Sequence, residues 1–461
     1  MVPKEALLEL ERAVGERWVL KDPIQLISYE SDALSLTRST PDVVVLPKDE
    51  DEVIEVVKIC RKYGIPITPR GSGTALSGSA IAVKGGVLLV FSRMNRFIEL
   101  DEENGVAVVE PGVLTKEVSD IAKMRGLNMY FAPDPASYEV STIAGNIAHN
   151  AGGPHCLKHG VVSNYLLGAR VVLPDGEVYE VGGKALERPG YDLTGLLLSS
   201  EGTLAIITSA TLKLSKVPEG TRTIMAIFDR MDDAAQAVSD IIASGIIPSA
   251  LEFMDHLTIK AVEEKLKVGY PLDAEAILLI EVDGLKDGLD VLADRIVEIC
   301  KRNGVREIKR ARSEEERELL WRGRRGIAGA VGYYAPYYLL EDGVVPRTKL
   351  VEAMKRAREI GEKYGFIVPN GCHLGDGNLH PYIMFKDLDE ETKRRVMKAG
   401  DEILKVCVEL GGSVSGEHGI GISKKELLPV IYSKDDIEVM KRVKGALDPD
   451  GLFNPGKIFP D

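Results

Sequence analysis

Two histidines near residue 375 and a carboxylate further along the chain have the spacing of a catalytic metal site. His373 and His380 flank the tight turn Gly375-Asp376-Gly377, so a chain reversal there would bring both imidazoles to one side. Glu417 adds an oxygen ligand and completes a set of two histidines and one carboxylate with open coordination positions. Such a set favours a catalytic metal over a structural one. The same pattern is also compatible with ordinary surface or core histidines near strand ends.

A second group of motifs, rich in glycine and small polar residues, suits a phosphate-containing ligand. Residues 69–74 read Pro-Arg-Gly-Ser-Gly-Thr after a predicted strand, so successive backbone N–H groups could point at a phosphate. This loop is neither a Walker loop nor GxGxxG, and alone it is equally compatible with a structural turn. Two further segments of this texture are residues 142–153, Thr-Ile-Ala-Gly-Asn-Ile-Ala-His-Asn-Ala-Gly-Gly, and residues 200–208, Ser-Glu-Gly-Thr-Leu-Ala-Ile-Ile-Thr.

The elements that must position these motifs differ between parts of the chain. Residues 40–217 alternate short β-rich runs with glycine and proline turns and begin with a β–α–β pattern. Residues 218–425 read as strand, helix, strand, helix, which is typical of split β–α–β domains. Residues 426–461 predict a helix followed by a turn. The length of 461 residues favours more than one domain.

In this order and spacing, the three glycine-rich motifs resemble the FAD-binding domain of the vanillyl-alcohol oxidase/p-cresol methylhydroxylase (PCMH) flavoprotein superfamily. The resemblance covers essentially the whole chain and is closest to the FAD-linked D-lactate dehydrogenase and glycolate oxidase catalytic-subunit branch. It implies an α+β fold that begins with a two-subdomain PCMH-type FAD-binding domain at 1–217. An α+β, ferredoxin-like cap domain for substrate and metal would follow at 218–425. A C-terminal segment, 426–461, would pack back on the FAD domain and return to the flavin.

The resemblance also implies which residues contact FAD. The first loop would cradle the pyrophosphate, the second would run beside the flavin ring, and Asn454 would begin a C-terminal element that reaches the flavin edge. The first loop lacks the histidine that binds flavin covalently in some members, so non-covalent FAD is implied. The expected contacts are Pro69, Arg70, Gly71, Ser72, Gly73, Thr74, Ser77, Gly78, Ser79, Pro133, Asp134, Ser137, Thr142, Gly145, Asn146, Gly152, Gly153, Glu201, Gly202, Ile206, Ile207 and Asn454.

Three other histidines lie near the second motif, but nothing in the local sequence marks any of them as a catalytic base. We interpret His149, His155 and His159 as packed or hydrogen-bonded structural residues.

The metal motifs resemble those of the family's 2-hydroxy-acid dehydrogenases. The resemblance implies that His373, His380 and Glu417 bind a divalent ion, zinc by default and manganese or iron as alternatives. It makes His418 the catalytic base. The stretch Trp-Arg-Gly-Arg that ends at Arg324 resembles an element whose arginine clamps the substrate carboxylate. A solvated basic helix face would explain the same arginines.

These roles predict an FAD- and metal-dependent dehydrogenase that oxidises a small D-2-hydroxy acid to the 2-oxo acid. The base would take the hydroxyl proton and flavin N5 the hydride. Family members that act on dicarboxylates carry a lysine before a strand-end aspartate and an asparagine two residues after the second metal histidine. This chain has no lysine at 339–342 and has Tyr382 at the second position. A monocarboxylate is therefore expected, D-lactate first and glycolate next.

Composition limits the partners. The net charge of −13 argues against nucleic acid, and no apolar run reaches the roughly 18 residues of a membrane helix. The N-terminus reads as an amphipathic helix and not as a signal peptide, so a cytoplasmic protein is expected, with a peripheral membrane location through a partner as an alternative.

Five cysteines without a CxxC pair indicate no iron–sulfur cluster in this chain. Electrons would then pass to an external acceptor, such as an electron-transfer flavoprotein, an iron–sulfur subunit or a quinone. A homodimer is one open assembly.

Two other functions fit the same fold. One is an ether-lipid synthase of the alkyl-dihydroxyacetonephosphate type, which uses flavin without net redox change and lacks this metal pair. The other is a non-catalytic FAD subunit that relays electrons, which should lack both the metal and the arginine motifs. The presence of both motifs here counts against these alternatives.

Overall fold

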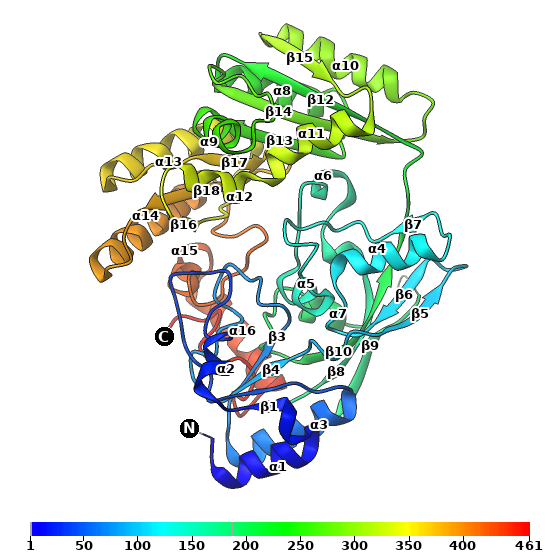
Figure 1. Cartoon of the computed structure of the whole chain (residues 1–461), viewed down its shortest axis with the longest axis vertical. Coiled ribbons are helices and arrows are strands. Elements are labelled where there is room, and N and C mark those ends of the chain that lie inside the picture. Colours follow the sequence, from blue (N-terminus) through cyan, green and yellow to red (C-terminus); the bar gives the residue numbers. More distant parts are fainter. Residues whose placement is uncertain (1, 186–188) are drawn as a thin grey trace. The chain divides into compact units, whose positions relative to one another are not determined.

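The computed structural model describes residues 2–185 and 189–461, and the chain divides into two compact units. The first unit holds Met1–Gly152, Val161–Val217 and Glu417–Asp461, and the second holds Gly153–Gly160 and Pro218–Gly416. Each unit is an α+β assembly of sheets and helices, labelled in Figure 1.

The first sheet of the first unit has the order β1-β2-β4-β3, in which β2, β4 and β3 are parallel and β1 is antiparallel to β2. Its helix α3 joins β2 to β3, begins at an Asp49 cap with three acidic residues in its first turn, and ends at Gly64 in the left-handed region. The apolar face of α3 packs with β2, β4 and α1 in one core. The elements are α1 (Lys4–Val14), η1 (Glu16–Trp18), β1 (Val19–Leu20), α2 (Pro23–Ile27), β2 (Val43–Val45), α3 (Glu50–Tyr63), β3 (Ile67–Arg70) and β4 (Val87–Val90).

The second sheet of the first unit is antiparallel with the order β5-β6-β10-β8-β9. The helices α4 and α5 pack against its apolar face in a separate core. Strands β7 and β11 form a small ribbon beside it. The elements are β5 (Phe97–Asp101), β6 (Val106–Val109), α4 (Thr115–Met124), β7 (Met129–Tyr130), α5 (Ile143–His149), η2 (Val162–Asn164), β8 (Leu166–Val172), β9 (Val178–Gly182), α7 (Leu193–Leu197), β10 (Ile206–Lys213) and β11 (Ser215–Lys216).

The C-terminal part of the chain returns to the first sheet. After η5 (Lys425–Leu427), α15 (Leu428–Ile431) and α16 (Lys434–Leu447), the backbone of Ile67 in β3 donates to Leu452 O and accepts from Asn454 N. The tail therefore lies beside β3, the strand that leads into the first glycine-rich loop.

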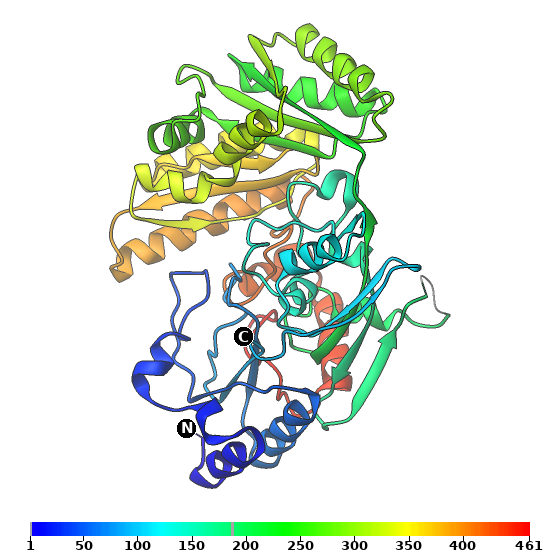
Figure 2. The same cartoon turned by 45° about the vertical axis from the view of Figure 1, so that its right-hand side comes forward.

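The second unit is built on a seven-stranded antiparallel sheet with the order β15-β12-β14-β13-β17-β18-β16. Side chains of β12 point alternately into two cores, one on each face of the sheet. Ile224 and Phe228 pack against α8, α10 and α13. Met225 and Ile227 pack against α9, α11 and α12. Helices therefore cover both faces of the sheet, and α13 and α14 lie side by side in both views (Figures 1 and 2).

The elements of the second unit are α6 (Cys156–His159), β12 (Gly220–Phe228), α8 (Met231–Ala243), β13 (Ala250–Asp255), α9 (His256–Leu266), β14 (Ala276–Gly284), α10 (Leu289–Arg302), β15 (Glu307–Arg310), α11 (Glu314–Arg325), α12 (Ile327–Ala330), η3 (Val331–Tyr333), β16 (Tyr337–Leu340), η4 (Arg347–Lys349), α13 (Leu350–Tyr364), β17 (Asn370–His373), β18 (Asn378–Phe385) and α14 (Glu390–Glu409).

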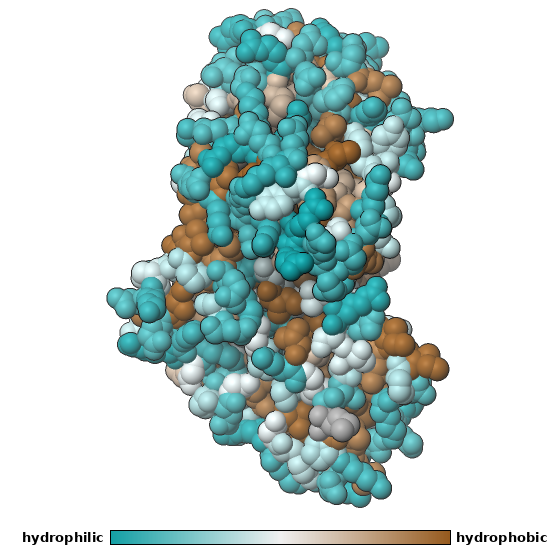
Figure 3. Space-filling model, turned by 90° about the vertical axis from the view of Figure 1, so that its left-hand side faces the viewer, coloured by the Kyte–Doolittle hydropathy of each residue, from teal (hydrophilic) through white to brown (hydrophobic). Residues whose placement is uncertain are grey.

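The surface drawn in Figure 3 carries mostly hydrophilic residues, with hydrophobic ones in small groups. Among residues 2–185 and 189–461, no helix combines the length and the apolar composition needed to cross a bilayer.

Candidate active site

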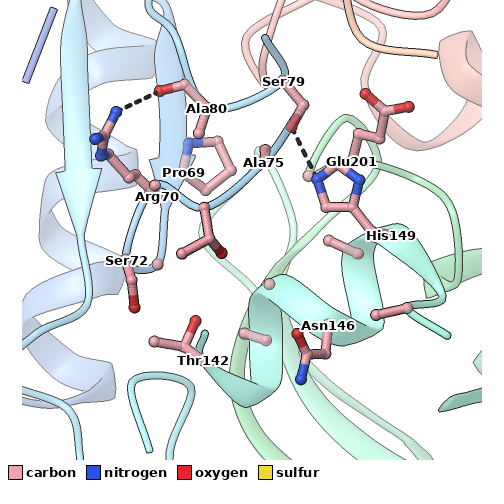
Figure 4. A pocket seen from close by; sticks show the side chains of 18 of the residues that line it. Pro69, Arg70, Ser72, Ala75, Ser79, Ala80, Thr142, Asn146, His149 and Glu201 are labelled. Carbon is pink, nitrogen blue, oxygen red and sulfur yellow. Dashed lines mark hydrogen bonds between the residues drawn. The ribbon is translucent and has the colours of Figure 1, made fainter. Parts of the chain in front are cut away.

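A pocket in the first unit brings the glycine-rich motifs together (Figure 4). Its walls come chiefly from residues 69–80, 135–151 and 200–207, and Glu417 and His418 complete them. It encloses about 1210 Å³, part of which is open to solvent.

The first loop of this pocket leaves β3 at Arg70 and requires glycine at two places. A Cβ at Gly71 would lie 2.1 Å from Thr142 Oγ1, and one at Gly73, where φ is +75°, would lie 2.1 Å from Arg70 Nη2. Arg70 is buried and donates to Ala80 O at 3.2 Å (Figure 4). Burial lowers the pKa of Arg70 below its usual range. A buried cation at the start of this glycine-rich loop fits an anionic group such as a pyrophosphate.

In the second unit, a β-hairpin brings the two motif histidines together. His373 ends β17, His380 lies in β18, and the turn between them contains Gly377 at φ +86°. The two buried rings lie 4.9 Å apart between centroids, with perpendicular planes. The chain reversal expected at the glycine turn therefore places both imidazoles on one side of the hairpin.

A fully buried carboxylate, Glu252 of β13, links this hairpin to the arginine motif. His373 Nδ1 lies 2.8 Å from both carboxylate oxygens of Glu252, and Arg324 Nη2 lies 2.6 Å from its Oε2. Burial acts to raise the pKa of Glu252, but Arg324 and His373 outweigh it and hold this pKa below its usual range. Glu252 was not expected from the sequence, where the available signal is an acidic residue in the middle of the apolar strand Ala-Leu-Glu-Phe-Met-Asp, which also ends in an acidic residue.

Arg324 lies on α11, which packs closely against Tyr270. A Cβ at Gly323 would lie 2.4 Å from the hydroxyl oxygen of Tyr270, so glycine is needed there. Glu252 raises the pKa of Arg324, although burial, the larger influence, acts to lower it. Arg324 Nε is buried and has no hydrogen-bond partner among the described residues. The guanidinium therefore keeps one donor for a further acceptor.

The segment before Glu417 runs along the same hairpin. Val344 bridges both Asn378, the first residue of β18, and Ser413. Gly416 N, in the last residue of the second unit, donates to both Asp342 O and Asp342 Oδ2 at 3.0 Å. The chain therefore reaches Glu417 from a segment that pairs beside the start of β18.

Two family models match most of the chain. A model described as the C-terminal domain of FAD-linked oxidases matches residues 217–458, and one described as an FAD-binding domain matches residues 41–182. The chain belongs to the FAD-linked oxidase family. This FAD-linked oxidoreductase therefore binds FAD, as the motifs implied.

Relatives support the same family. Glycolate oxidase subunit GlcD of Escherichia coli (strain K12) is 40% identical over 454 residues, which cover 98% of this chain and 91% of that protein. GlcD of Bacillus subtilis (strain 168) is 41% identical, with 94% of this chain and 92% of that protein covered. A D-lactate dehydrogenase of Anaerostipes hadrus is 32% identical, with 99% and 98% covered.

Solved structures share the fold. p-Cresol methylhydroxylase with bound substrate superposes with a TM-score of 0.82 at 18% identity, covering 99% of this chain and 96% of that one. 4-Ethylphenol oxidase from Gulosibacter chungangensis gives 0.82 at 21% identity, with 99% and 97% covered. The PCMH-type fold predicted for this FAD-linked oxidase is thereby confirmed.

Most of the residues expected to contact FAD line the pocket of the first unit. These are Pro69, Arg70, Gly71, Ser72, Gly73, Thr74, Ser79, Ser137, Thr142, Gly145, Asn146, Glu201, Gly202, Ile206 and Ile207. The remaining members of the expected set do not line it: Ser77, Gly78, Pro133, Asp134, Gly152, Gly153 and Asn454.

Three of these remaining residues contact the segments that form or adjoin the pocket walls. Ser77 O accepts the N–H groups of Ile422 and Ser423, and a Cβ at Gly78 would lie 2.5 Å from Ile422 Cγ1. Asn454 Nδ2 donates to Ser79 O at 2.9 Å and to Glu201 O at 2.7 Å. These residues therefore hold neighbouring loops in place, while Gly153 belongs to the second unit.

The three histidines interpreted as structural are hydrogen-bonded, but one of them also lines the pocket. His155 Nε2 lies 3.4 Å from Glu281 Oε1, and His159 Nε2 lies 3.0 Å from Asp283 Oδ2, both in the second unit. His149 instead lines the pocket and contacts Ser79 Oγ. Its position at the end of α5, directly after small pocket residues, was the one available signal.

Proposed function

We propose that this FAD-linked oxidoreductase oxidises a small D-2-hydroxy monocarboxylate to the 2-oxo acid, with D-lactate as the first candidate and glycolate as the next. FAD would bind non-covalently in the pocket of the first unit. A divalent ion, zinc first and manganese or iron as alternatives, would bind His373, His380 and Glu417, each of which offers one ligand atom.

One observation carries the proposal. Glu417, the proposed metal ligand, and His418, the proposed base, are consecutive in the chain, and both line the pocket of the first unit. The peptide bond before Glu417 joins it to the segment that pairs beside the metal hairpin. The names of the relatives, glycolate oxidase subunit GlcD and D-lactate dehydrogenase, support the substrate class.

Each proposed residue has a definite task. When bound, FAD supplies a hydride acceptor and the divalent ion lowers the pKa of the substrate hydroxyl. His418 takes the hydroxyl proton, a contribution of about 10²–10⁴ in rate for a well-placed base. Arg324 Nε donates to the substrate carboxylate while Glu252 holds the other side of the guanidinium.

The proposed preference for a monocarboxylate is supported by the groups around the hairpin. Tyr382 is buried and stands edge-to-face on Tyr338 at 5.4 Å between ring centroids. Glu341 and Asp342 are buried carboxylates where dicarboxylate-specific relatives would need a cation. A second substrate carboxylate would meet like charge there, which is unfavourable at low dielectric.

Electrons must then leave the flavin. All five cysteines are free, and Cys60, Cys300, Cys372 and Cys407 are buried as core residues. We therefore propose an external acceptor, such as an electron-transfer flavoprotein, an iron–sulfur subunit or a quinone, and a cytoplasmic location.

The test is anaerobic bleaching of the flavin absorbance by D-lactate, L-lactate, glycolate and D-2-hydroxyglutarate, before and after treatment with EDTA. Bleaching by D-lactate or glycolate that EDTA removes and a divalent ion restores would support substrate class and metal together. His380→Ala should behave like the EDTA-treated protein, and His256→Ala, outside both sites, should behave like the wild type. No bleaching by any hydroxy acid in metal-replete protein would refute the substrate class and favour the ether-lipid or relay functions.

A further inference from the structure

We propose that His149 and Glu201 are positioning residues for His418, and that they fix the backbone on which the base is carried. This inference rests on the proposed role of His418 as the base. It assigns to both side chains a function other than direct contact with flavin.

His149 binds the backbone of the base directly. Its Nδ1 lies 3.0 Å from His418 O, and its Nε2 lies 2.8 Å from Ser79 Oγ (the latter bond is drawn in Figure 4). A carbonyl oxygen only accepts, so Nδ1 carries a proton and donates to His418 O. The imidazole thus connects the first glycine-rich loop to the peptide that follows the base.

Glu201 fixes the backbone of Ile420 and Gly421, two and three residues after the base. Its carboxylate accepts from Ile420 N at 2.7 Å and from Gly421 N at 2.8 Å. Its side chain is buried, and its own backbone has a φ of +51° in the left-handed region. A non-glycine residue in this conformation costs energy and is retained where the surroundings require it.

The two positioning residues also support each other. Glu201 N donates to Ala148 O at 2.9 Å, directly before His149 in the chain. Between them lies Gly419, where φ is +83° and a Cβ would be 2.7 Å from Glu201 Oε1 and 3.0 Å from His149 Nδ1. The turn after His418 therefore closes tightly against both side chains and has no room for a larger residue.

This arrangement determines where the imidazole of His418 can lie. The turn contains two glycines with positive φ, Gly419 and Gly421, so its own sequence allows many conformations. Hydrogen bonds from outside the turn select one of them. A displacement of about 1 Å at a reacting group can cost about 10²-fold in rate.

Two isosteric substitutions separate the two bonds of His149. The side-chain amide of His149→Asn reaches the position of Nδ1 and can still donate to His418 O. The amide of His149→Gln reaches the position of Nε2 and keeps only the contact with Ser79. His256→Gln is the matched control, because His256 also places Nδ1 3.0 Å from a backbone carbonyl, Ala274 O, but in the second unit.

Four quantities test this inference: the rate of flavin reduction, the KM, the FAD dissociation constant and amide hydrogen exchange. We expect His149→Gln to slow flavin reduction at saturating substrate by about 10-fold or more, and His149→Asn to stay within about 3-fold of the wild type. The KM and the FAD dissociation constant, the latter from flavin fluorescence, should stay near wild-type values. Amide hydrogen exchange over residues 417–421 should become faster in His149→Gln but not in His149→Asn, and this readout needs no substrate.

Glu201→Gln gives an independent test. The glutamine amide has only one oxygen to accept from the N–H groups of Ile420 and Gly421, and its NH₂ group cannot accept from either. We expect slower flavin reduction and faster exchange over residues 417–421, with Glu110→Gln as a buried-carboxylate control in the same unit. Wild-type rates and exchange in both His149→Gln and Glu201→Gln would overturn the inference, as would loss of FAD from both. Equal slowing by His149→Asn and His149→Gln would overturn the assigned bond to His418. A wild-type flavin that no hydroxy acid reduces counts instead against the proposed function.

Discussion

The buried pair between Glu252 and Arg324 yields the sharpest prediction for the second unit. Glu252→Gln keeps the shape of the side chain but removes the charge that faces Arg324 at 2.6 Å and His373 at 2.8 Å. Removing one partner of a buried ion pair leaves the other charge uncompensated and costs about 3–5 kcal/mol. We therefore expect the free energy of unfolding of this unit to fall by about that amount.

The same carboxylate should matter separately for the metal. A carboxylate bonded to the distal nitrogen of a ligating histidine fixes its tautomer and orientation, and its loss costs about 10–100-fold in metal affinity. The affinity of Glu252→Gln for zinc or manganese, measured by calorimetry on metal-free protein, should fall by this factor.

The assay can report on the second unit alone. The chain has two tryptophans, and Trp321 is buried on α11, the helix that carries Arg324. In a Trp18→Phe background, urea unfolding followed by tryptophan fluorescence therefore reports on that helix. Glu252→Gln/Arg324→Met removes both charges and should recover most of the stability but only part of the metal affinity, because the carboxylate that orients His373 is still missing. An unfolding midpoint for Glu252→Gln equal to that of its parent would refute this reasoning.

Further predictions concern the base, the clamp, the first loop and a pH effect. His418→Ala should keep its flavin but reduce it about 10²–10⁴-fold more slowly, and normal turnover would remove the base from that position. Arg324→Lys keeps a charge for Glu252 but loses the fork, so the KM for D-lactate should rise about 10–100-fold; an unchanged KM would place the clamp elsewhere. Gly71→Ala should lose FAD, measured as flavin absorbance per protein, because its Cβ would lie 2.1 Å from Thr142 Oγ1, whereas Gly329→Ala, with nothing within 4 Å, should keep it. Burial acts to raise the pKa of Glu281, but bonds from His155 and Arg317 outweigh burial and hold this pKa well below its usual range. The Glu281 carboxylate therefore stabilises the fold fully above the unfolded-state pKa of about 4.3, and this stabilisation decreases as the pH falls below that value. The urea midpoint should accordingly drop more between pH 7 and pH 4 in the wild type than in Glu281→Gln, and equal drops would contradict this assignment.

Local motifs predicted the parts of the site that lie close together in sequence. The glycine turn at 375–377 indicated the hairpin that joins His373 and His380, and the loop at 69–74 indicated the pocket wall after β3. Both depend on backbone geometry that glycine alone permits, which is visible in a sequence.

The contacts that sequence reasoning missed join residues far apart in the chain. His149 and Glu201 meet the turn after His418 from positions more than 200 residues earlier, and Glu252 meets Arg324 and His373 from a strand that reads as plain core. Residues 153–160 likewise belong to the second unit, because His155 and His159 bond to carboxylates of β14. Such pairings depend on tertiary packing and leave no periodic or local signal.

The charge balance around His373 shows why Glu252 is needed where it lies. Arg324 Nη2 lies only 3.4 Å from His373 Nδ1, so a divalent ion on that histidine would add positive charge beside a buried guanidinium. Coulomb repulsion between cations is strong at low dielectric, and it would weaken metal binding unless an anion stands between them. Glu252 contacts both groups and supplies that charge before substrate arrives. Under the proposed function, a substrate carboxylate would therefore meet an arginine that Glu252 already holds in place, and its binding would order fewer groups.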